Sequence, residues 1–260
     1  MDLKNSLLKV GLISLLAFGA SVHAAEQTLR IGIEAAYPPF ASKTPDNKIV
    51  GFDYDIGQAL CAEMKVQCVW QEQEFDGLIP ALKVKKVDAV ISSVSITPER
   101  LKSVDFTDRY YRIPARLVFK KGSGITDIPA QLKGKRIGVQ RATNFDRYVT
   151  EKFAPAGAEI VRYSSQNEVF LDLLGGRLDA TMASSVVIDE SLLKRPQGSE
   201  YEFVGPNFTE EQFFGTGIGI AVRKGDALKE RFNQALATIR ANGTYDTIRK
   251  KYFDFDIYGE

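Results

Sequence analysis

Hydroxyl, carboxylate and guanidinium side chains gather in four short stretches of the sequence, and the richest is "SSVSITPER". It holds Ser92, Ser93, Ser95 and Arg100, and its Thr-Pro step is typical of a helix start that would place Arg100 in the first turn. A planar guanidinium can hold a carboxylate through two parallel hydrogen bonds. The stretch therefore predicts an anion-binding loop, and the alternative is an ordinary capped helix with a surface arginine.

A carboxylate and two aromatic rings suggest a second recognition element. In "EAAYPPF", Glu34 follows a short apolar strand, with Tyr37 three residues later, and Phe75 lies in "EFDGLIPAL". A carboxylate in a partly desolvated cleft requires a cation from the protein or from a ligand. Tyr37 and Phe75 could cover the faces of a flat cation such as a guanidinium, although Phe75 could equally be a core residue beneath a helix.

The remaining two stretches are "QRATNF" and "ASSVV". The first offers Gln140, Thr143 and Asn144 at the entry to a predicted helix, where hydroxyl, amide and backbone N–H groups suit an anion. Its alternative is a plain helix cap, because no glycine pattern for binding phosphate is present. The second holds Ser184 at the end of another apolar strand.

These stretches belong to a repeated pattern. "LRIGIEAAYPPF" (29–40) is echoed by "KRIGVQRATNF" (135–145), and "LIPALKVKKVDAVISS" (78–93) by "VFLDLLGGRLDATMASS" (169–185). Strand and helix signals that alternate in this way predict α/β lobes with parallel sheets and crossover helices. Ligands bind at the carboxyl ends of such strands, so all four stretches would converge on a cleft between two lobes. Two lobes with a plain interface and no ligand are the alternative.

The pattern also predicts individual elements. In the first half we expect a helix over 51–63 and a strand over 66–71. In the second half we expect a helix over 144–153, a strand over 159–163 and a helix over 165–174.

Composition excludes several classes of function. Residues 1–24 have two lysines, an apolar run and small residues at the end, which predicts a secretory signal cleaved after Ala24 or Ala25. The rest of the chain has no histidine and equal numbers of basic and acidic residues, 32 of each. Catalytic sites that need histidine, histidine-ligated metal sites and nucleic-acid binding are therefore not expected, nor is a cofactor.

In an exported chain Cys61 and Cys68 predict a structural disulfide, with a reduced buried pair as the alternative.

Taken together, the chain resembles the periplasmic amino-acid-binding proteins of ABC importers, particularly the lysine/arginine/ornithine, histidine and arginine binders. The resemblance runs from about residue 26 to the end. The stretches that carry it are "GFDYDIGQALCAEM", "EFDGLIPALKVKKVDAVISSVSIT" followed by "PER", "GRLDA" and "NGTYDTIRKKYFDFDIYGE".

The resemblance implies an α/β fold of two lobes, joined by two crossing strands, that close on the ligand at a hinge. Lobe 1 would comprise residues 25–113 and 213–260, and lobe 2 residues 114–212. Arg100 would bind the ligand's α-carboxylate together with Thr143 and Asn144, while Ser92, Ser93 and Ser95 hold its backbone groups. Glu34 would bind the distal cation, between walls that include Tyr37 and Phe75.

Three positions depart from the family pattern. Ser184 stands where relatives have an aspartate that pairs with the α-ammonium, and Asp189 lies too far along the chain to replace it. Ala142 stands where relatives have a glycine, and Asn144 where they have a second hydroxyl residue. A neutral Ser184 would forgo about 1.5–3 kcal/mol in binding an ammonium group. The ligand could therefore be a free cationic amino acid bound with some loss, or an N-substituted arginine such as an opine.

The sequence thus predicts a monomeric periplasmic receptor, not an enzyme, that delivers a cationic amino acid to the membrane permease of an ABC importer. A dehydratase on the same scaffold is a weaker alternative, because Glu34 is the only evident acid or base for catalysis. The sensor module of a signalling protein is also disfavoured, because the sequence shows no transmembrane segment or output domain.

Overall fold

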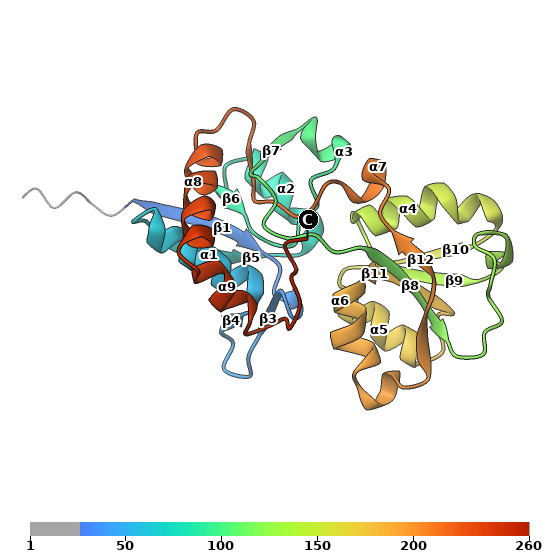
Figure 1. The fold of residues 1–260 in the computed structure, drawn as a ribbon. Helices are drawn as coiled ribbons and strands as arrows, with labels where there is room; N and C mark the ends of the chain where they lie inside the picture. Colours follow the sequence, from blue (N-terminus) through green and yellow to red (C-terminus); the bar gives the residue numbers. More distant parts are fainter. Residues whose placement is uncertain (1–26, 260) are drawn as a thin grey trace, which may run out of the picture.

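A computed structural model describes residues 27–259, which form two α/β lobes side by side (Figure 1). The predicted signal segment lies outside the described residues. The first lobe is built on a five-stranded sheet with the order β5-β1-β6-β13-β7. Its strands are β1 (Thr28–Ile33), β5 (Gln67–Glu72), β6 (Ala89–Val90), β7 (Val104–Phe106) and β13 (Ala221–Arg223). Its helices are α1 (Phe52–Glu63), α2 (Phe75–Lys83), α3 (Pro98–Leu101), α8 (Leu228–Ala241) and α9 (Thr244–Arg249).

The second lobe repeats this design with the order β10-β9-β11-β8-β12. Its strands are β8 (Ala115–Lys120), β9 (Arg136–Gln140), β10 (Glu159–Tyr163), β11 (Ala180–Ser184) and β12 (Tyr201–Phe208). Its helices are α4 (Asn144–Lys152), α5 (Gln166–Leu174), α6 (Ser185–Ile188), which continues as a π-helical turn (Asp189–Leu193), and α7 (Glu211–Phe214). Short 3-10 turns cover Ala130–Leu132, Ala154–Ala156 and Pro196–Gly198. A small sheet of β2 (Ala36–Tyr37), β3 (Ala41–Lys43) and β4 (Ile49–Val50) follows β1.

The predicted repeat is confirmed in the pairing of strands and side chains. β1 and β9 each lie between two parallel neighbours. Arg30 of β1 donates to Asp88 through its N–H and its guanidinium, and Arg136 of β9 does the same to Asp179. Asp88 and Asp179 are the aspartates of the repeated Asp-Ala step. Each comes directly before a strand that pairs with the arginine's strand, β6 in the first lobe and β11 in the second. The same residue types thus fix the same strand register in both halves.

Each sheet departs from the all-parallel arrangement that the repeat predicts. β13 pairs antiparallel with β6 and β7, and β8 pairs antiparallel with β11 and β12. The reason lies in the path of the chain. β8 is entered from the first lobe and β13 from the second, so these strands arrive from the cleft side and run against the parallel core.

Two segments cross between the lobes, residues 107–114 and 209–220, and they pair with each other. Tyr111 forms an isolated antiparallel bridge with Ile218, which also bridges Ser95. The C-terminal segment lies against the same place, because the N–H of Arg112 donates to the carbonyl of Ile257 at 2.9 Å. Figure 1 shows the C-terminus between the two lobes.

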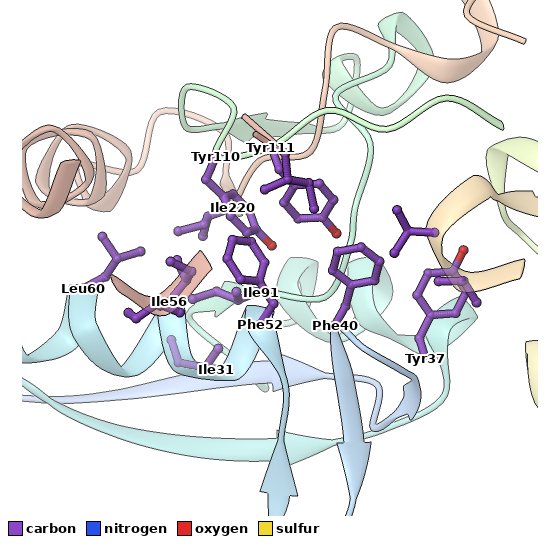
Figure 2. Close-up of a cluster of buried hydrophobic side chains, with 14 of the residues drawn as sticks. Ile31, Tyr37, Phe40, Phe52, Ile56, Leu60, Ile91, Tyr110, Tyr111 and Ile220 are labelled. Carbon is purple, nitrogen blue, oxygen red and sulfur yellow. The ribbon is translucent and has the colours of Figure 1, made fainter. Parts of the chain in front are cut away.

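An aromatic cluster fills the first lobe beside these crossings (Figure 2). Phe40 stacks on Tyr111 with ring centroids 4.9 Å apart and an angle of 5° between the planes. Phe52, Ile56 and Leu60 are spaced along α1 to present one apolar face, and all three are fully buried. α1 therefore forms because its apolar stripe packs between the sheet and the aromatic cluster.

The expected elements agree with the structure to within two residues at each end. The predicted disulfide is present: Cys61 at the end of α1 is bonded to Cys68 of β5, with Cα atoms 6.1 Å apart. Among residues 27–259, none of the helices combines the length and apolar character needed to cross a bilayer.

Candidate ligand-binding site

A cavity of about 290 Å³ lies between the lobes, where β1, β6, β9 and β11 end. Ten of the eleven predicted binding residues line it: Glu34, Tyr37, Phe75, Ser92, Ser93, Ser95, Gln140, Thr143, Asn144 and Ser184. The eleventh, Arg100, lines a neighbouring cavity that shares Thr143 and Asn144 with the first. The convergence of four strand ends, expected from the repeat, is therefore found.

Glu34 and Gln140 face each other across this cavity. They occupy equivalent positions in the two copies of the repeat, and their side chains are almost fully buried, with 5% and 2% of their surface exposed. Gln140 Nε2 donates to Glu34 Oε1 at 2.5 Å and to the carbonyl of Ser164 at 2.9 Å. Burial raises the pKa of the Glu34 carboxyl to about 7, against the lowering effect of the Gln140 hydrogen bond. The nearby carboxylates of Glu74 and Asp76 raise the same pKa further.

The serines after β6 differ in what they can offer a ligand. The Ser92 hydroxyl accepts a hydrogen bond from the Glu34 N–H at 2.9 Å, which fixes the backbone beneath the carboxylate. The Ser93 hydroxyl donates to Asp53 and accepts from Tyr111. Ser95 also lines the cavity, and among residues 27–259 its hydroxyl takes part in no hydrogen bond.

α4 begins at the opposite wall of the cavity. Thr143 is its N-cap, as expected: the hydroxyl accepts from the Asp146 N–H at 3.1 Å and donates to the Gln140 carbonyl at 2.7 Å. Ala142 before it has a φ of 60°, a left-handed conformation in which glycine is normally found. The Thr143 hydroxyl is therefore engaged within the protein, and the open N-terminus of α4 is what this wall presents to an anion.

Arg100 stands behind Ser95 and Phe75. It lies in the first turn of α3, which Thr97 caps as expected by accepting from the Arg100 N–H. Its Nη1 donates to the Ser95 carbonyl at 3.1 Å, and its guanidinium carbon is 5.5 Å from the centre of the Phe75 ring. Desolvation, and then the charge of Arg147, lower the pKa of the Arg100 guanidinium to about 10. Within residues 27–259 the guanidinium has no carboxylate partner.

Tyr37 and Ser184 form another contact between the lobes. The Ser184 N–H donates to the Tyr37 hydroxyl at 3.4 Å. The Ser184 hydroxyl is buried at the end of β11 and finds no hydrogen-bond partner among the described residues. Asp189 lies outside the cavity lining and pairs with Lys194 at 2.9 Å, so it does not replace a carboxylate at position 184.

Several residues at the site were not predicted from the sequence. Arg141, next to Gln140, reaches across to the start of α2, where its Nε lies 2.6 Å from Asp76 and its Nη2 contacts Glu74. The cavity also continues along the crossing segments, beyond the predicted residues. That part is lined by Phe40, Tyr111, Arg112, Ile113, Pro114, Ala115, Phe145, Asn207, Phe208, Thr209, Phe214, Gly215, Gly217, Ile218 and Gly259. The opposite charges of Arg141 and of Glu74 and Asp76 in the "EFD" stretch could have suggested an ion pair. Nothing in the sequence near either stretch indicated that the two come into contact.

The described residues contain no cluster of three or more acidic, histidine or cysteine side chains that could hold a metal ion. The site therefore consists of one buried acid, free backbone and hydroxyl groups and aromatic walls, with a half-buried arginine in the adjoining cavity. Such a set can bind a small molecule that carries both a cationic and an anionic group.

Comparison with known proteins agrees with this geometry. An L-arginine-binding protein of Pseudomonas aeruginosa is 55% identical to the chain over 96% of the chain and 97% of the relative. A lysine/arginine/ornithine-binding periplasmic protein of Escherichia coli is 42% identical over 99% of the chain and 100% of the relative. A solved structure of an ancestral arginine-binding protein bound to arginine superposes with a TM-score of 0.81 at 37% identity, covering 88% of the chain and 99% of that structure.

Residues 29–255 match the bacterial extracellular solute-binding proteins, family 3. This match spans both lobes and the cavity between them, as does the similarity to the relatives. The two-lobed α/β fold expected from the sequence is therefore confirmed, and the chain belongs to family 3 of the bacterial extracellular solute-binding proteins.

Proposed function

We propose that the chain binds a cationic amino acid of the arginine, ornithine or lysine type between its lobes and delivers it to the permease of an ABC importer. The observation that carries this proposal is Glu34, a buried carboxylate in the cavity that is held by a neutral amide and lacks a cationic partner among the described residues. A ligand guanidinium or ammonium would supply that partner. Tyr37 and Phe75 line the same cavity and suit the flanks of such a cation.

The other end of the ligand would be its carboxylate. Arg100 is the proposed anchor, because its charge is desolvated and unpaired among residues 27–259. The first N–H groups of α4, at Thr143 and Asn144, add the positive end of a helix dipole. Ser92, Ser93 and Ser95 would complete the site through the backbone of their loop and the free hydroxyl of Ser95.

Closure at a hinge is part of the same proposal. We place lobe 1 at residues 25–113 and 213–260 and lobe 2 at residues 114–212, so that the hinge falls in the crossing segments. The cavity draws residues from both lobes, and a ligand that contacts both would favour the closed arrangement. Cleavage after Ala24 or Ala25 and residence in the periplasm as a monomer complete the proposal.

The site supports binding without chemistry. Glu34 is the one acidic side chain that lines the cavity within the described residues. A proton transfer would need a second acid or base, and the nearby carboxylates of Glu74 and Asp76 pair with Arg141 and do not line the cavity. The names of the curated relatives, which describe arginine-binding and lysine/arginine/ornithine-binding proteins, support the receptor over a dehydratase.

A second ligand class is favoured by one specific observation. The buried hydroxyl of Ser184 lacks a partner, and the cavity continues from it along the crossing segments. A free α-ammonium would meet a neutral serine here, whereas an N-substituent would have space. N-substituted arginines of the opine type are therefore the alternative ligands.

Replacing Glu34 tests the cation site. Glu34→Gln should weaken L-arginine binding at least about 30-fold by calorimetry, because a desolvated charge pair is lost. Affinity in the wild type should fall up to tenfold per pH unit below about pH 7, because the ligand needs the ionised form of a carboxyl whose pKa is raised to about 7. Glu72→Gln, at the end of the neighbouring strand, is the matched control. Unchanged affinity in Glu34→Gln would contradict the proposal.

Replacing Arg100 tests the carboxylate anchor. Arg100→Ala should reduce arginine affinity about 100-fold and make the increase in melting temperature that the ligand causes smaller, because the carboxylate loses its charge partner. Arg162→Ala removes another arginine of the neighbouring cavity and serves as the control. An equal loss of arginine affinity in the two variants would contradict the proposed anchor. Arg100 would then act only through the positive charge that it shares with the other arginines of the neighbouring cavity.

Replacing Ser184 distinguishes the two ligand classes. Ser184→Asp should strengthen binding of free arginine about 10- to 100-fold, because an ammonium gains a charged partner, and should weaken binding of an N-carboxyalkyl arginine. The measurement is calorimetry with both ligands. A constant affinity ratio between them would place residue 184 away from the amine.

A further inference from the structure

Asp53 is a fully buried carboxylate that lies behind the cavity without lining it. It occupies the first turn of α1 and is 0% exposed. Its Oδ2 accepts from the Ser93 N–H at 2.6 Å and from the Ser93 hydroxyl at 2.9 Å, and its Oδ1 accepts from the Tyr110 hydroxyl at 2.8 Å. No Lys or Arg side chain within residues 27–259 pairs with it. The carboxyl group is therefore held by hydrogen bonds alone, which come from the binding loop (residues 92–95) and from the first crossing segment.

The Ser93 backbone needs this support. Its φ is 51°, in the left-handed region that residues other than glycine seldom adopt. Asp53 receives both donors of Ser93, and the Tyr111 hydroxyl donates to Ser93 Oγ at 2.7 Å. The conformation of Ser93 sets the path of the chain between Ser92 and Ser95, which both line the cavity. The shape of the loop between Ser92 and Ser95 therefore depends on Asp53, which does not line the cavity.

The same carboxylate reaches the crossing between the lobes. Tyr110 and Tyr111 belong to the first crossing segment, and both pair through their backbones with Ile218 of the second. In Figure 2 both tyrosine rings lie within the aromatic cluster, with Tyr111 beside Phe40. The hydrogen bonds of Asp53 thus join the start of α1, the binding loop and the hinge region.

We propose that Asp53 is a positioning residue for ligand binding, which holds Ser93 in its left-handed conformation and couples the binding loop to the crossing segments. This rests on the proposed function of the cavity. Glycine adopts a left-handed φ without support from other residues. With glycine at position 93, the affinity for L-arginine should therefore no longer depend on Asp53.

The test is a double-mutant cycle on the mature protein, with L-arginine affinity measured by calorimetry. Asp53→Asn keeps the size of the side chain but removes an acceptor, and should weaken binding at least about tenfold. The double variant Asp53→Asn/Ser93→Gly should return to the affinity of Ser93→Gly alone, while its melting temperature stays low. A double variant as weak as Asp53→Asn would overturn the proposal, as would unchanged affinity in Asp53→Asn.

The chain supplies a matched control two residues away. Asp55 lies in the same helical turn but pairs with Lys251 and Tyr252, away from the binding loop. Asp55→Asn should leave affinity within about twofold of the wild type. If Asp53→Asn does not fold, Tyr110→Phe compared with Tyr252→Phe carries the same test, because each removes one Tyr–Asp hydrogen bond to α1. Equal affinities in this pair would overturn the proposal.

An error in the proposed ligand can be told apart from an error in the proposed role of Asp53. A wild type that binds no cationic amino acid would contradict the ligand assignment, and amide hydrogen exchange of residues 91–96 then tests Asp53. The Ser93 N–H should be protected in the wild type and in Asp55→Asn, and should exchange at least tenfold faster in Asp53→Asn. Equal protection in all three proteins would overturn the positioning role.

Discussion

The hydrogen bond between Gln140 and Glu34 joins the two lobes at the centre of the cavity, and the rest of the site is organised around the carboxylate that it holds. Glu34 is buried where an ionised carboxyl is disfavoured, and the protein offers it an amide instead of a cation. Burial therefore leaves a charge to be balanced. A cationic ligand would balance it at the one place where the carboxyl ends of β1 and β9 meet.

The duplication explains why this contact exists. Equivalent strands carry Glu34 in one lobe and Gln140 in the other, and the Arg–Asp pairs at Asp88 and Asp179 hold those strands in the same register. Two copies of one design thus face each other with different chemistry at the matching position. One copy provides the carboxyl group, and the other provides a neutral amide that donates to it.

The remaining contacts between the lobes are weak enough for a ligand to decide the balance between open and closed. Arg141 contacts Asp76 and Glu74 from a position where these side chains are between 34% and 62% exposed. Ion pairs of this exposure contribute about 0–1 kcal/mol. The contact of Ser184 with Tyr37 is a single long hydrogen bond. Ligand contacts made with both lobes would add to these, so occupancy would favour the closed arrangement.

Local patterns were enough to predict the repeat, the main helices and strands, the disulfide and ten residues of the cavity lining. They were not enough for features created by contacts distant in sequence. The antiparallel strands β8 and β13 depend on where the chain crosses, and the engagement of the Ser93 hydroxyl by Asp53 joins residues 40 positions apart. Arg100 was expected beside the others, but it stands behind Ser95 in the adjoining cavity, because its guanidinium bonds to the carbonyl of that residue. The ligand roles and the lobe boundaries stay predictions.

A crystal structure of the protein grown with L-arginine tests the central claim most directly. The account predicts a guanidinium nitrogen about 2.7–2.9 Å from the Glu34 carboxylate, with Gln140 beside it and both lobes in contact with the ligand. A ligand bound elsewhere, with Glu34 still bonded only to Gln140, would contradict it.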